Sequence, residues 1–293
     1  MSKVYSIITD EIIKRLEAGV IPWRRPWKSC AGGVPDSNIV SGKAYRGINP
    51  FLLGTHGFEC PYWLTFRQSK QLGGHVRKGE KGQVIIFFTT FDKDEQNDAG
   101  DTVTRSLPCL RFYRVFNADQ CEGIDHKRLA ELRATVDTLP TFDPISEAQG
   151  IIDGMPDRPT IEHGARRSCY QPAGDTVQLP DPSRFDPPEE YYSTAFHELV
   201  HSTGHKRRLD RRDADRERWF GSGDYSTEEL IAEMGAAMLC GRARIEQATL
   251  DNSAAYIANW LQVLRKDTRA VIVAASAAQK AADFILGVRP AQA

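Results

Sequence analysis

The 293-residue sequence lacks the marks of a secreted, membrane-inserted or disulfide-stapled protein. No stretch approaches about 18 consecutive apolar residues, and an amphipathic pattern rather than an apolar signal core follows the first residues. The six cysteines, at positions 30, 60, 109, 121, 169 and 240, show neither C-x-x-C spacing nor the density of a disulfide framework, which indicates reduced thiols. These absences predict a cytoplasmic protein.

The chain also lacks a P-loop, an internal repeat and a low-complexity tract. Residues 73–82 are glycine-rich and basic, but the Gly-Lys-Ser/Thr ending that leads into a helix is missing, so nucleotide hydrolysis receives no support. Hydrophobic residues make up 41% of the chain, which argues against wholesale disorder. The length suffices for two domains of ordinary size.

A net charge of −1 conceals an uneven distribution of charge along the chain. Residues 1–91 carry 13 Lys and Arg against 6 Asp and Glu, a balance of +7, which leaves 25 against 33, or −8, for residues 92–293. A basic front part predicts a polyanionic partner such as nucleic acid. Ordinary charge scatter between domains is the alternative, and the count alone does not decide between them.

Aromatic side chains alternate with cations in the basic front part. The segment 21–28 places Trp23 and Trp27 among three cations, with prolines that hold the backbone extended. Rings on which bases stack, next to cations for the phosphates, are what single-strand binding requires. Alternatively, the two tryptophans fill the core while the arginines are solvated. On the first interpretation the DNA-binding residues are Trp23, Arg24, Arg25, Trp27, Lys43, Tyr45, Arg46, Arg67, Lys70, Arg77, Lys78 and Lys81.

Hydrophobic periodicity outlines the elements of the front part. Apolar residues at helical spacing over 4–16, followed by Gly19, predict an opening helix, and residues 62–72 predict a second, short helix. Residues 84–91 and 107–116 predict two paired strands, with the acidic run 92–101 as a solvated hairpin loop between them.

A rise in proline content from residue 126 to residue 189 predicts a domain boundary near 120–150. We therefore expect an α+β protein with an N-terminal DNA-binding domain over 1–125, a linker at 126–150 and a C-terminal domain over 151–293. Residues 168–180 predict two short strands around a turn, either ordinary sheet or an edge that pairs with an extended peptide. Alanine-rich helices are expected over 254–264 and 269–286.

The rear part contains an H-E-x-x-H motif on a strongly helical segment. His197 and His201 are four residues apart, so they project from one face of a helix and can share one divalent ion such as Zn²⁺. Glu198 lies where it can take a proton from a metal-bound water, as the general base in attack on a carbonyl. The bare pattern also occurs in helices whose histidines bind no metal.

The neighbours of the motif favour the metal interpretation. Phe196, Leu199 and Val200 give the helix a buried side. Gly204, three residues after His201, is placed to end the helix in the left-handed C-cap conformation.

A catalytic metal site needs a third protein ligand and an open position. Arg207 occupies the position of the third metzincin histidine, so that class is excluded. The better donor lies in 225–239, a second predicted helix that opens with the capping-box spacing of Ser226 and Glu229. Glu229 and Glu233 are then one turn apart, the gluzincin arrangement, with Glu229 as ligand and Glu233 orienting a histidine. The alternative makes Glu229 a capping residue and Glu233 the ligand.

Six stretches spread over nearly the whole chain occur together in one known family. They are Pro-Trp-Arg-Arg-Pro-Trp at 22–27, residues 45–49, 63–66, 76–82, 197–205 and 228–233. Together they resemble the ArdC-type antirestriction proteins of conjugative plasmids, whose front domain is shared with plasmid primases. The resemblance implies a front domain that binds single-stranded DNA and a rear zincin-like domain similar to SprT-type metallopeptidases. It also implies a role in protecting incoming plasmid DNA from host restriction during conjugation.

Two functions from different classes follow from this resemblance. In the first, DNA binding delivers the metal site to protein targets on the DNA, such as restriction enzymes, and Glu198 activates water for peptide hydrolysis. In the second, the protein protects the entering strand by occupying it, and the metal site is structural or inactive. The ion is Zn²⁺ or another divalent cation such as Mn²⁺.

Overall fold

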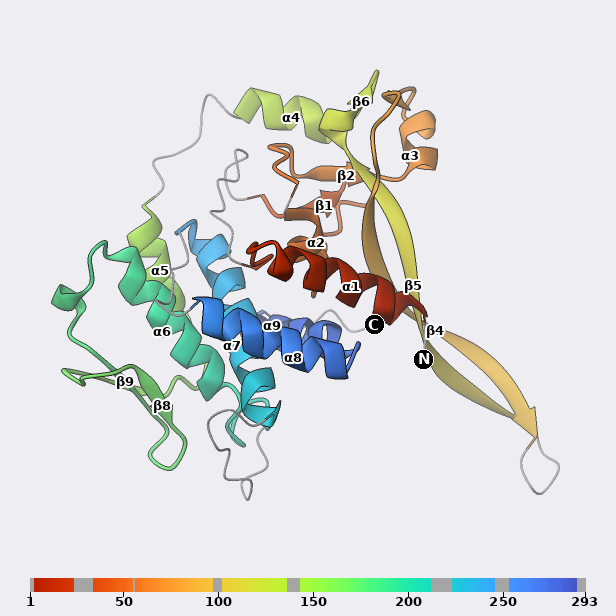
Figure 1. The fold of residues 1–293 in the computed structure, drawn as a ribbon. Helices are drawn as coiled ribbons and strands as arrows, with labels where there is room; N and C mark the ends of the chain where they lie inside the picture. Colours follow the sequence, from red (N-terminus) through yellow and green to blue (C-terminus); the bar gives the residue numbers. More distant parts are fainter. Residues whose placement is uncertain are drawn as a thin grey trace.

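The structure, a computed structural model, describes residues 3–23, 34–54, 56–96, 102–135, 143–211, 223–245 and 253–288. Helices and sheets are both present, and the expected α+β class is confirmed. Figure 1 shows a front part with a long two-stranded ribbon and a rear part in which helices predominate. None of the helices in the described ranges is long and apolar enough to cross a membrane.

The front part is built around a sheet with strand order β1-β2-β5-β4. Strands β4 and β5 continue beyond this sheet as a ribbon, while β3 pairs with β6 in a separate two-stranded sheet. The front elements are α1 (Lys3–Glu17), β1 (Ser37–Asn38), α2 (Asn49–Gly54), β2 (Tyr62–Leu64), α3 (Phe66–Gln71), β3 (His75–Val76), β4 (Gln83–Gln96), β5 (Thr102–Asn117), η1 (Ala118–Gln120), β6 (Cys121–Glu122) and α4 (Lys127–Thr135).

The ribbon confirms the predicted strand pair but not the predicted loop. Ile86 lies opposite Phe112, and the antiparallel ladder continues outward to the pair Gln96 and Thr102. The acidic run 92–101 was therefore wrongly assigned to a loop over residues 92–96. Charged residues are depleted in strands but not excluded from them, so an acidic run does not by itself end a backbone ladder.

The predicted helix over 62–72 is correct only in its second half. Residues Tyr62–Leu64 form strand β2, whose Trp63 is buried. Helix α3 begins at Phe66 because Thr65 and Gln68 form a capping box, in which each side chain accepts a hydrogen bond from the other residue's backbone N–H.

Helix α1 confirms the opening helix and ties the front part to the rear part. Gly19, with a φ of 75°, follows the end of the helix. The buried face of α1, which includes Ile8 and Ile12, joins one hydrophobic core with the rear helices, and Figure 1 shows α1 alongside α8. The Thr9 hydroxyl donates to the Thr268 carbonyl at 2.6 Å. Front and rear parts therefore share a continuous core.

The rear part places a small sheet against a helical core. The sheet has the order β7-β9-β8, with β7 parallel and β8 antiparallel to β9, which confirms the two strands predicted within 168–180. The predicted alanine-rich helices are confirmed as α8 and α9. The rear elements are α5 (Pro144–Gly154), β7 (Thr160–His163), β8 (Cys169–Gln171), β9 (Thr176–Leu179), η2 (Pro182–Arg184), α6 (Glu189–Ser202), α7 (Gly223–Ala243), α8 (Ser253–Lys266) and α9 (Ala270–Ile285).

The predicted linker contains secondary structure. Residues 126–150 include α4 and the first seven residues of α5, and Ala148 of α5 is buried in the shared core. The boundaries 1–125 and 151–293 stay predictions.

Candidate metal centre

Helices α6 and α7 supply the side chains of the predicted metal site. On α6 the fully buried Phe196, Leu199 and Val200 face the core, which directs the histidines of the motif towards α7. The two helices approach closely at Gly235 of α7, where a Cβ atom would lie 2.7 Å from Cγ2 of Val200. Because glycine has no Cβ atom, α6 and α7 can approach closely enough here for side chains of both helices to form one site.

Helix α6 ends differently from the prediction. Its C-cap is Thr203 in a right-handed conformation, with φ −62° and ψ −18°, and Gly204 does not adopt a positive φ. The Ser202 hydroxyl donates to the Leu199 carbonyl, and the Thr203 hydroxyl donates to the Val200 carbonyl, each at 2.7 Å. These hydroxyls occupy carbonyls at the helix end, so a left-handed glycine cap is not needed.

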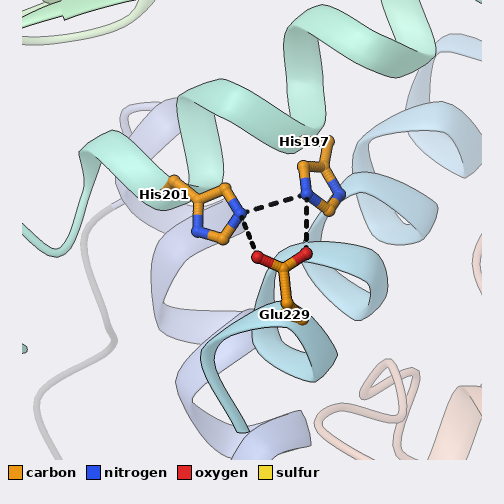
Figure 2. Close-up of side chains that lie close together, drawn as sticks. All are labelled: His197, His201 and Glu229. Carbon is orange, nitrogen blue, oxygen red and sulfur yellow. Dashed lines mark hydrogen bonds and ion pairs between the residues drawn. The ribbon is translucent and has the colours of Figure 1, made fainter. Parts of the chain in front are cut away.

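The structure brings three predicted ligands together (Figure 2). Nε2 of His197 lies 3.0 Å from Nε2 of His201, and both nitrogens lie 3.4 Å from an oxygen of Glu229. The three donor atoms lie within 4.8 Å of one another. Two imidazole nitrogens and one carboxylate oxygen form a donor set typical of catalytic zinc sites, and this set also suits related divalent ions.

The other ring nitrogen of each histidine faces a second carboxylate. Nδ1 of His197 lies 4.0 Å from Glu233, and Nδ1 of His201 lies 3.6 Å from Glu228. Outer carboxylates of this kind set the tautomer and orientation of metal-binding histidines. Sequence reasoning missed Glu228, although it directly precedes Glu229 and neighbouring helical residues can border one site.

The carboxylates outweigh burial in setting the protonation of the two imidazoles. Burial lowers the pKa of His201, but hydrogen bonds with Glu228 and Glu229 raise it to about 10. For His197, burial also lowers the pKa, and the hydrogen bond with Glu229 leaves it above the ordinary value. Burial raises the pKa of Glu228, while His201 and Arg211 lower it to about 2.

The charge of the cluster suits a cation. The carboxylates of Glu198, Glu228, Glu229 and Glu233 are all buried around the two imidazoles. Arg211 pairs with Glu228 at 3.0 Å. Buried charges need compensation, and an excess of carboxylates is what a divalent ion compensates. The donor set and its electrostatics therefore fit a metal ion.

The predicted capping box of α7 is wrong, and this bears on the third ligand. Helix α7 begins at Gly223, three residues before Ser226, so Ser226 is not its N-cap. The alternative that made Glu229 a capping residue loses its basis. Glu229 reaches Nε2 of both histidines, whereas Glu233 faces the Nδ1 side of one. The geometry favours Glu229, and the ligand assignment stays a prediction.

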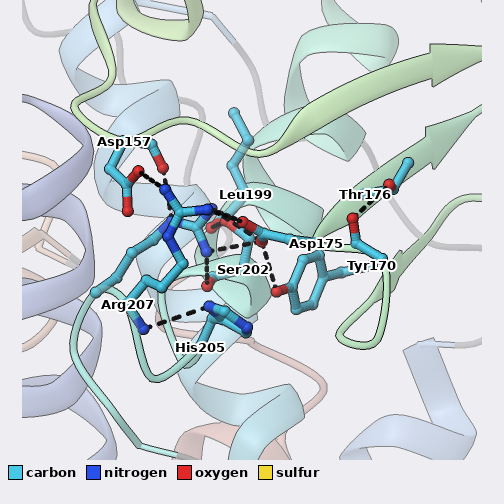
Figure 3. A network of polar contacts seen from close by, with 10 residues as sticks. Asp157, Tyr170, Asp175, Thr176, Leu199, Ser202, His205 and Arg207 are labelled. Carbon is cyan, nitrogen blue, oxygen red and sulfur yellow. Dashed lines mark hydrogen bonds and ion pairs between the residues drawn. The ribbon is translucent and has the colours of Figure 1, made fainter.

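Polar contacts fix the segment that follows helix α6 (Figure 3). The buried Arg208 side chain donates to the Ser202 carbonyl at 3.0 Å and pairs with Asp175 at 2.8 Å. Tyr170 donates to the same carboxylate at 2.8 Å. Burial, followed by this hydrogen bond, raises the pKa of Tyr170 to about 12. The contacts join the β8–β9 turn to the end of α6.

A second arginine reaches from the same segment into the site. Arg211 donates to the Thr203 hydroxyl at 2.6 Å and to the Val200 carbonyl at 2.9 Å, in addition to its pair with Glu228. Arg211 therefore connects the end of α6 to a carboxylate that faces His201. No sequence pattern indicated this role.

Trp23, predicted to bind DNA, is a core residue. It is 0% exposed and packs edge-to-face on Trp260 of α8, with ring centroids 5.1 Å apart. Its place in the core shared by front and rear parts supports the core-filling alternative for this ring. Arg24, Arg25 and Trp27 lie outside the described residues.

The other predicted DNA-binding residues in the described ranges fall into two groups: side chains that are partly buried or ion-paired, and exposed cations that form no ion pair. Tyr45 is partly buried, and Arg46 forms an ion pair with Asp283 of α9. Arg77 pairs with Glu80 at 2.8 Å. Of the predicted DNA-binding cations in the described ranges, Lys43, Arg67, Lys70, Lys78 and Lys81 are exposed and form no ion pair. Lys70 lies over the Phe66 ring, 5.0 Å from its centroid.

Comparisons with known proteins cover nearly the whole chain. The model for the N-terminal domain of anti-restriction factor ArdC matches residues 2–116, and the model of a zincin-like metallopeptidase matches residues 154–277. The metal-free crystal structure of the antirestriction ArdC protein from R388 plasmid is 36% identical, with a TM-score of 0.74 over 97% of both chains. The chain belongs to the ArdC family of antirestriction proteins. A Mn(II)-bound structure of the same relative is 35% identical, with a TM-score of 0.74 over 98% of both chains.

Two further relatives of this ArdC-family chain differ in their length. An uncharacterised protein, y4eC of Sinorhizobium fredii (strain NBRC 101917 / NGR234), is 34% identical over 291 residues, which cover 96% of this chain and 91% of the relative. DNA primase TraC of Escherichia coli is 34% identical over 304 residues, which cover 97% of this chain but 27% of the primase. The chain thus corresponds to about a quarter of that longer protein.

Proposed function

We propose that this protein protects incoming plasmid DNA from host restriction in the cytoplasm of a recipient bacterium. Its front part binds single-stranded DNA, and its rear part hydrolyses a peptide bond in a protein target on the DNA, such as a restriction enzyme. The observation that carries the proposal is the convergence of His197, His201 and Glu229 beside the buried Glu198. The family supplies the antirestriction context.

The histidines and Glu229 would hold the metal ion. Glu233 and Glu228 face the two Nδ1 atoms, so each ring keeps its proton there and presents the Nε2 lone pair to the ion. Zn²⁺ or Mn²⁺, when bound, supplies a Lewis acid that polarises a carbonyl and lowers the pKa of water.

Glu198 is the residue assigned to proton transfer. Its buried carboxylate lies on the same helix as both histidines. In peptide hydrolysis it takes a proton from the attacking water as the C–O bond forms, and returns it to the amine nitrogen as the C–N bond breaks. A residue in this role contributes about 10²–10⁴ in rate.

DNA binding by the front part draws on its exposed cations. Lys43, Arg67, Lys70, Lys78 and Lys81 can contact phosphates without breaking an ion pair described here. Binding through phosphates must weaken as salt rises, because each contact releases a condensed counterion.

The experiment that tests the peptidase half is Glu198→Gln in the full chain. The variant should retain metal and oligonucleotide affinity, lose peptide hydrolysis by a factor of about 10² or more, and lose restriction protection in a conjugation assay. If the variant protects as well as the natural chain, protection comes from DNA occupancy alone and the metal site is structural.

A further inference from the structure

The ribbon of β4 and β5 exposes large aromatic side chains on both of its faces. Phe87 and Phe88 of β4 are 59% and 54% exposed, and Phe112 and Tyr113 of β5 are each 44% exposed. Figure 1 shows the ribbon continuing away from the body of the molecule, although its inner part contacts α1, α2 and α3. Exposed aromatics concentrated in one place indicate a surface that binds something.

The register assigns these rings to faces. Residues directly opposite one another in an antiparallel pair share a face. Phe87 lies opposite Arg111, and Ile85 lies opposite Tyr113. Phe87, Arg111 and Tyr113 therefore share one face and form what we call the aromatic strip. Phe88 and Phe112 belong to the opposite face.

The aromatic strip is basic as well as apolar. Arg111 is exposed and lies directly opposite Phe87, and the nearby side chains of Cys109 and Tyr113 raise the pKa of its guanidinium. On this face, residues 83, 85, 87 and 89 of β4 and residues 109, 111, 113 and 115 of β5 include one arginine, Arg111, and no acidic residue. The charge of this surface therefore complements a phosphate backbone.

The foot of the same face is continuous with a basic loop. Ile85 and Val115 are buried there in a cluster with Trp63, and Tyr45 packs against that cluster. The segment around Tyr45 contributes the exposed Lys43. Cations thus continue from the strip onto the body of the front part.

The opposite face of the ribbon is less open. Val84 and Leu110 pack against the core that contains Ile8 of α1, and Ile86 is buried in that core. Arg114, on this face, donates to the Gly82 carbonyl at 2.9 Å. On the strip face, Leu53 of α2 packs at the foot with Ile85 and Val115, while Phe87, Arg111 and Tyr113 beyond the foot are exposed.

We propose that Phe87 and Tyr113 are a stacking platform for bases of single-stranded DNA, with Arg111 binding the phosphate between them. The inference rests on the proposed function, because the ligand is the same strand, and it adds a site that the sequence did not indicate. Two rings on diagonal positions of one face, about 7–8 Å apart, suit successive bases of an extended strand. If a second copy packed the same strip against this one, residues 83–89 and 109–117 would offer no acidic partner for the charge of Arg111.

The test measures the affinity of the full chain for a labelled oligothymidine by fluorescence anisotropy. Phe87→Ala and Tyr113→Ala should each weaken binding about tenfold, because stacking on a ring contributes on that scale. Phe88→Ala, the matched control on the opposite face, should bind as the natural chain does. Arg111→Gln should flatten the salt dependence by about 0.7 in log–log slope, whereas the ring variants leave the slope unchanged.

A spectroscopic variant separates stacking from a structural effect. Phe87→Trp keeps a ring in the strip, and its added fluorescence should be quenched by the oligonucleotide, whereas that of Phe88→Trp should not. This pair also serves if the alanine variant fails to fold.

The outcomes distinguish failure of the stacking platform from failure of the proposed DNA binding. If the natural chain has no affinity for the oligonucleotide at low salt, the proposed DNA function fails. If it binds and Phe87→Ala and Tyr113→Ala bind equally well, the platform is overturned while the function stands. The platform is also overturned if sedimentation shows a dimer that Phe87→Ala dissociates with DNA affinity unchanged.

Discussion

Glu228 lies 3.6 Å from Nδ1 of His201, on the other side of the imidazole from the nitrogen that faces Glu229. The histidine is thus held between two carboxylates of one helix. Arg211 holds Glu228 in turn. We expect these outer contacts to tune the predicted metal site without contacting a substrate.

Glu228→Gln should weaken divalent metal binding about tenfold or more, because an amide orients the His201 ring less strongly than a carboxylate does. The control is Glu147→Gln, since Glu147 of α5 pairs with Arg242 at 3.4 Å and is not part of the cluster. Isothermal titration calorimetry with Zn²⁺ and Mn²⁺ measures both. Equal affinities for the two variants would remove Glu228 from the site.

Metal binding should release protons and strengthen as pH rises. In the metal-free cluster the pKa of His201 is about 10, so this ring is protonated at neutral pH and must lose a proton to present a lone pair. Affinity should therefore increase from about pH 6 to about pH 9. Calorimetry in two buffers with different ionisation enthalpies counts the released protons. A pH-independent affinity with no proton release would contradict this electrostatic description.

Gly235→Ala should destabilise the protein by about 1–3 kcal/mol, because the added Cβ meets both γ-carbons of Val200 within 2.9 Å. Gly150→Ala is the matched control. Gly150 lies in α5 with no atom within 4 Å of an added Cβ, so the substitution should stabilise the helix by about 0.5–1 kcal/mol. Urea unfolding measures both. The close approach of α6 and α7 is not required if the two variants have equal stability.

Asp175→Asn should lower the free energy of unfolding at neutral pH by on the order of 3 kcal/mol, because it leaves the buried Arg208 guanidinium without its carboxylate. Although burial raises the pKa of Asp175, hydrogen bonds with Arg208 and Tyr170 lower it below the ordinary value. The carboxylate therefore stabilises the fold above its unfolded pKa of about 3.9, and this contribution is lost as pH falls through the folded pKa.

The difference between Asp175→Asn and the natural chain should shrink below about pH 4. Asp153→Asn is the control, because Asp153 pairs with Arg158 at 3.3 Å at the exposed surface, and such pairs contribute little. Chemical unfolding across pH measures both variants. A difference for Asp175→Asn that stays constant down to low pH would show that the ion pair is not its source.

The metal site was predictable where chemistry imposes a spacing. His197 and His201 lie on one face because the segment is helical. Glu229 was predicted because the site needs a third ligand, and its role as a ligand stays a prediction. Glu228 and Arg211 were not found, since outer contacts depend on how α6, α7 and the segment after α6 pack. No short-range pattern encodes that packing.

In the front part, too, contacts between distant residues could not be predicted from the sequence. The strands were predictable from their apolar residues, but their extension through residues 92–96 depends on backbone pairing, which an acidic composition does not rule out. Trp23 seemed suited to bases because of its neighbours in sequence, yet it packs on Trp260, more than two hundred residues later. A ring's partner in the core cannot be inferred from the cations beside it.

The most direct test of the account is a crystal structure of the full chain grown with Zn²⁺ or Mn²⁺, with the ion located by anomalous scattering. We expect one ion with Nε2 of His197, Nε2 of His201 and an oxygen of Glu229 within about 2.0–2.3 Å, and Glu198 beside an open coordination position. An ion bound through Glu233 instead of Glu229, or bound away from both histidines, would contradict it.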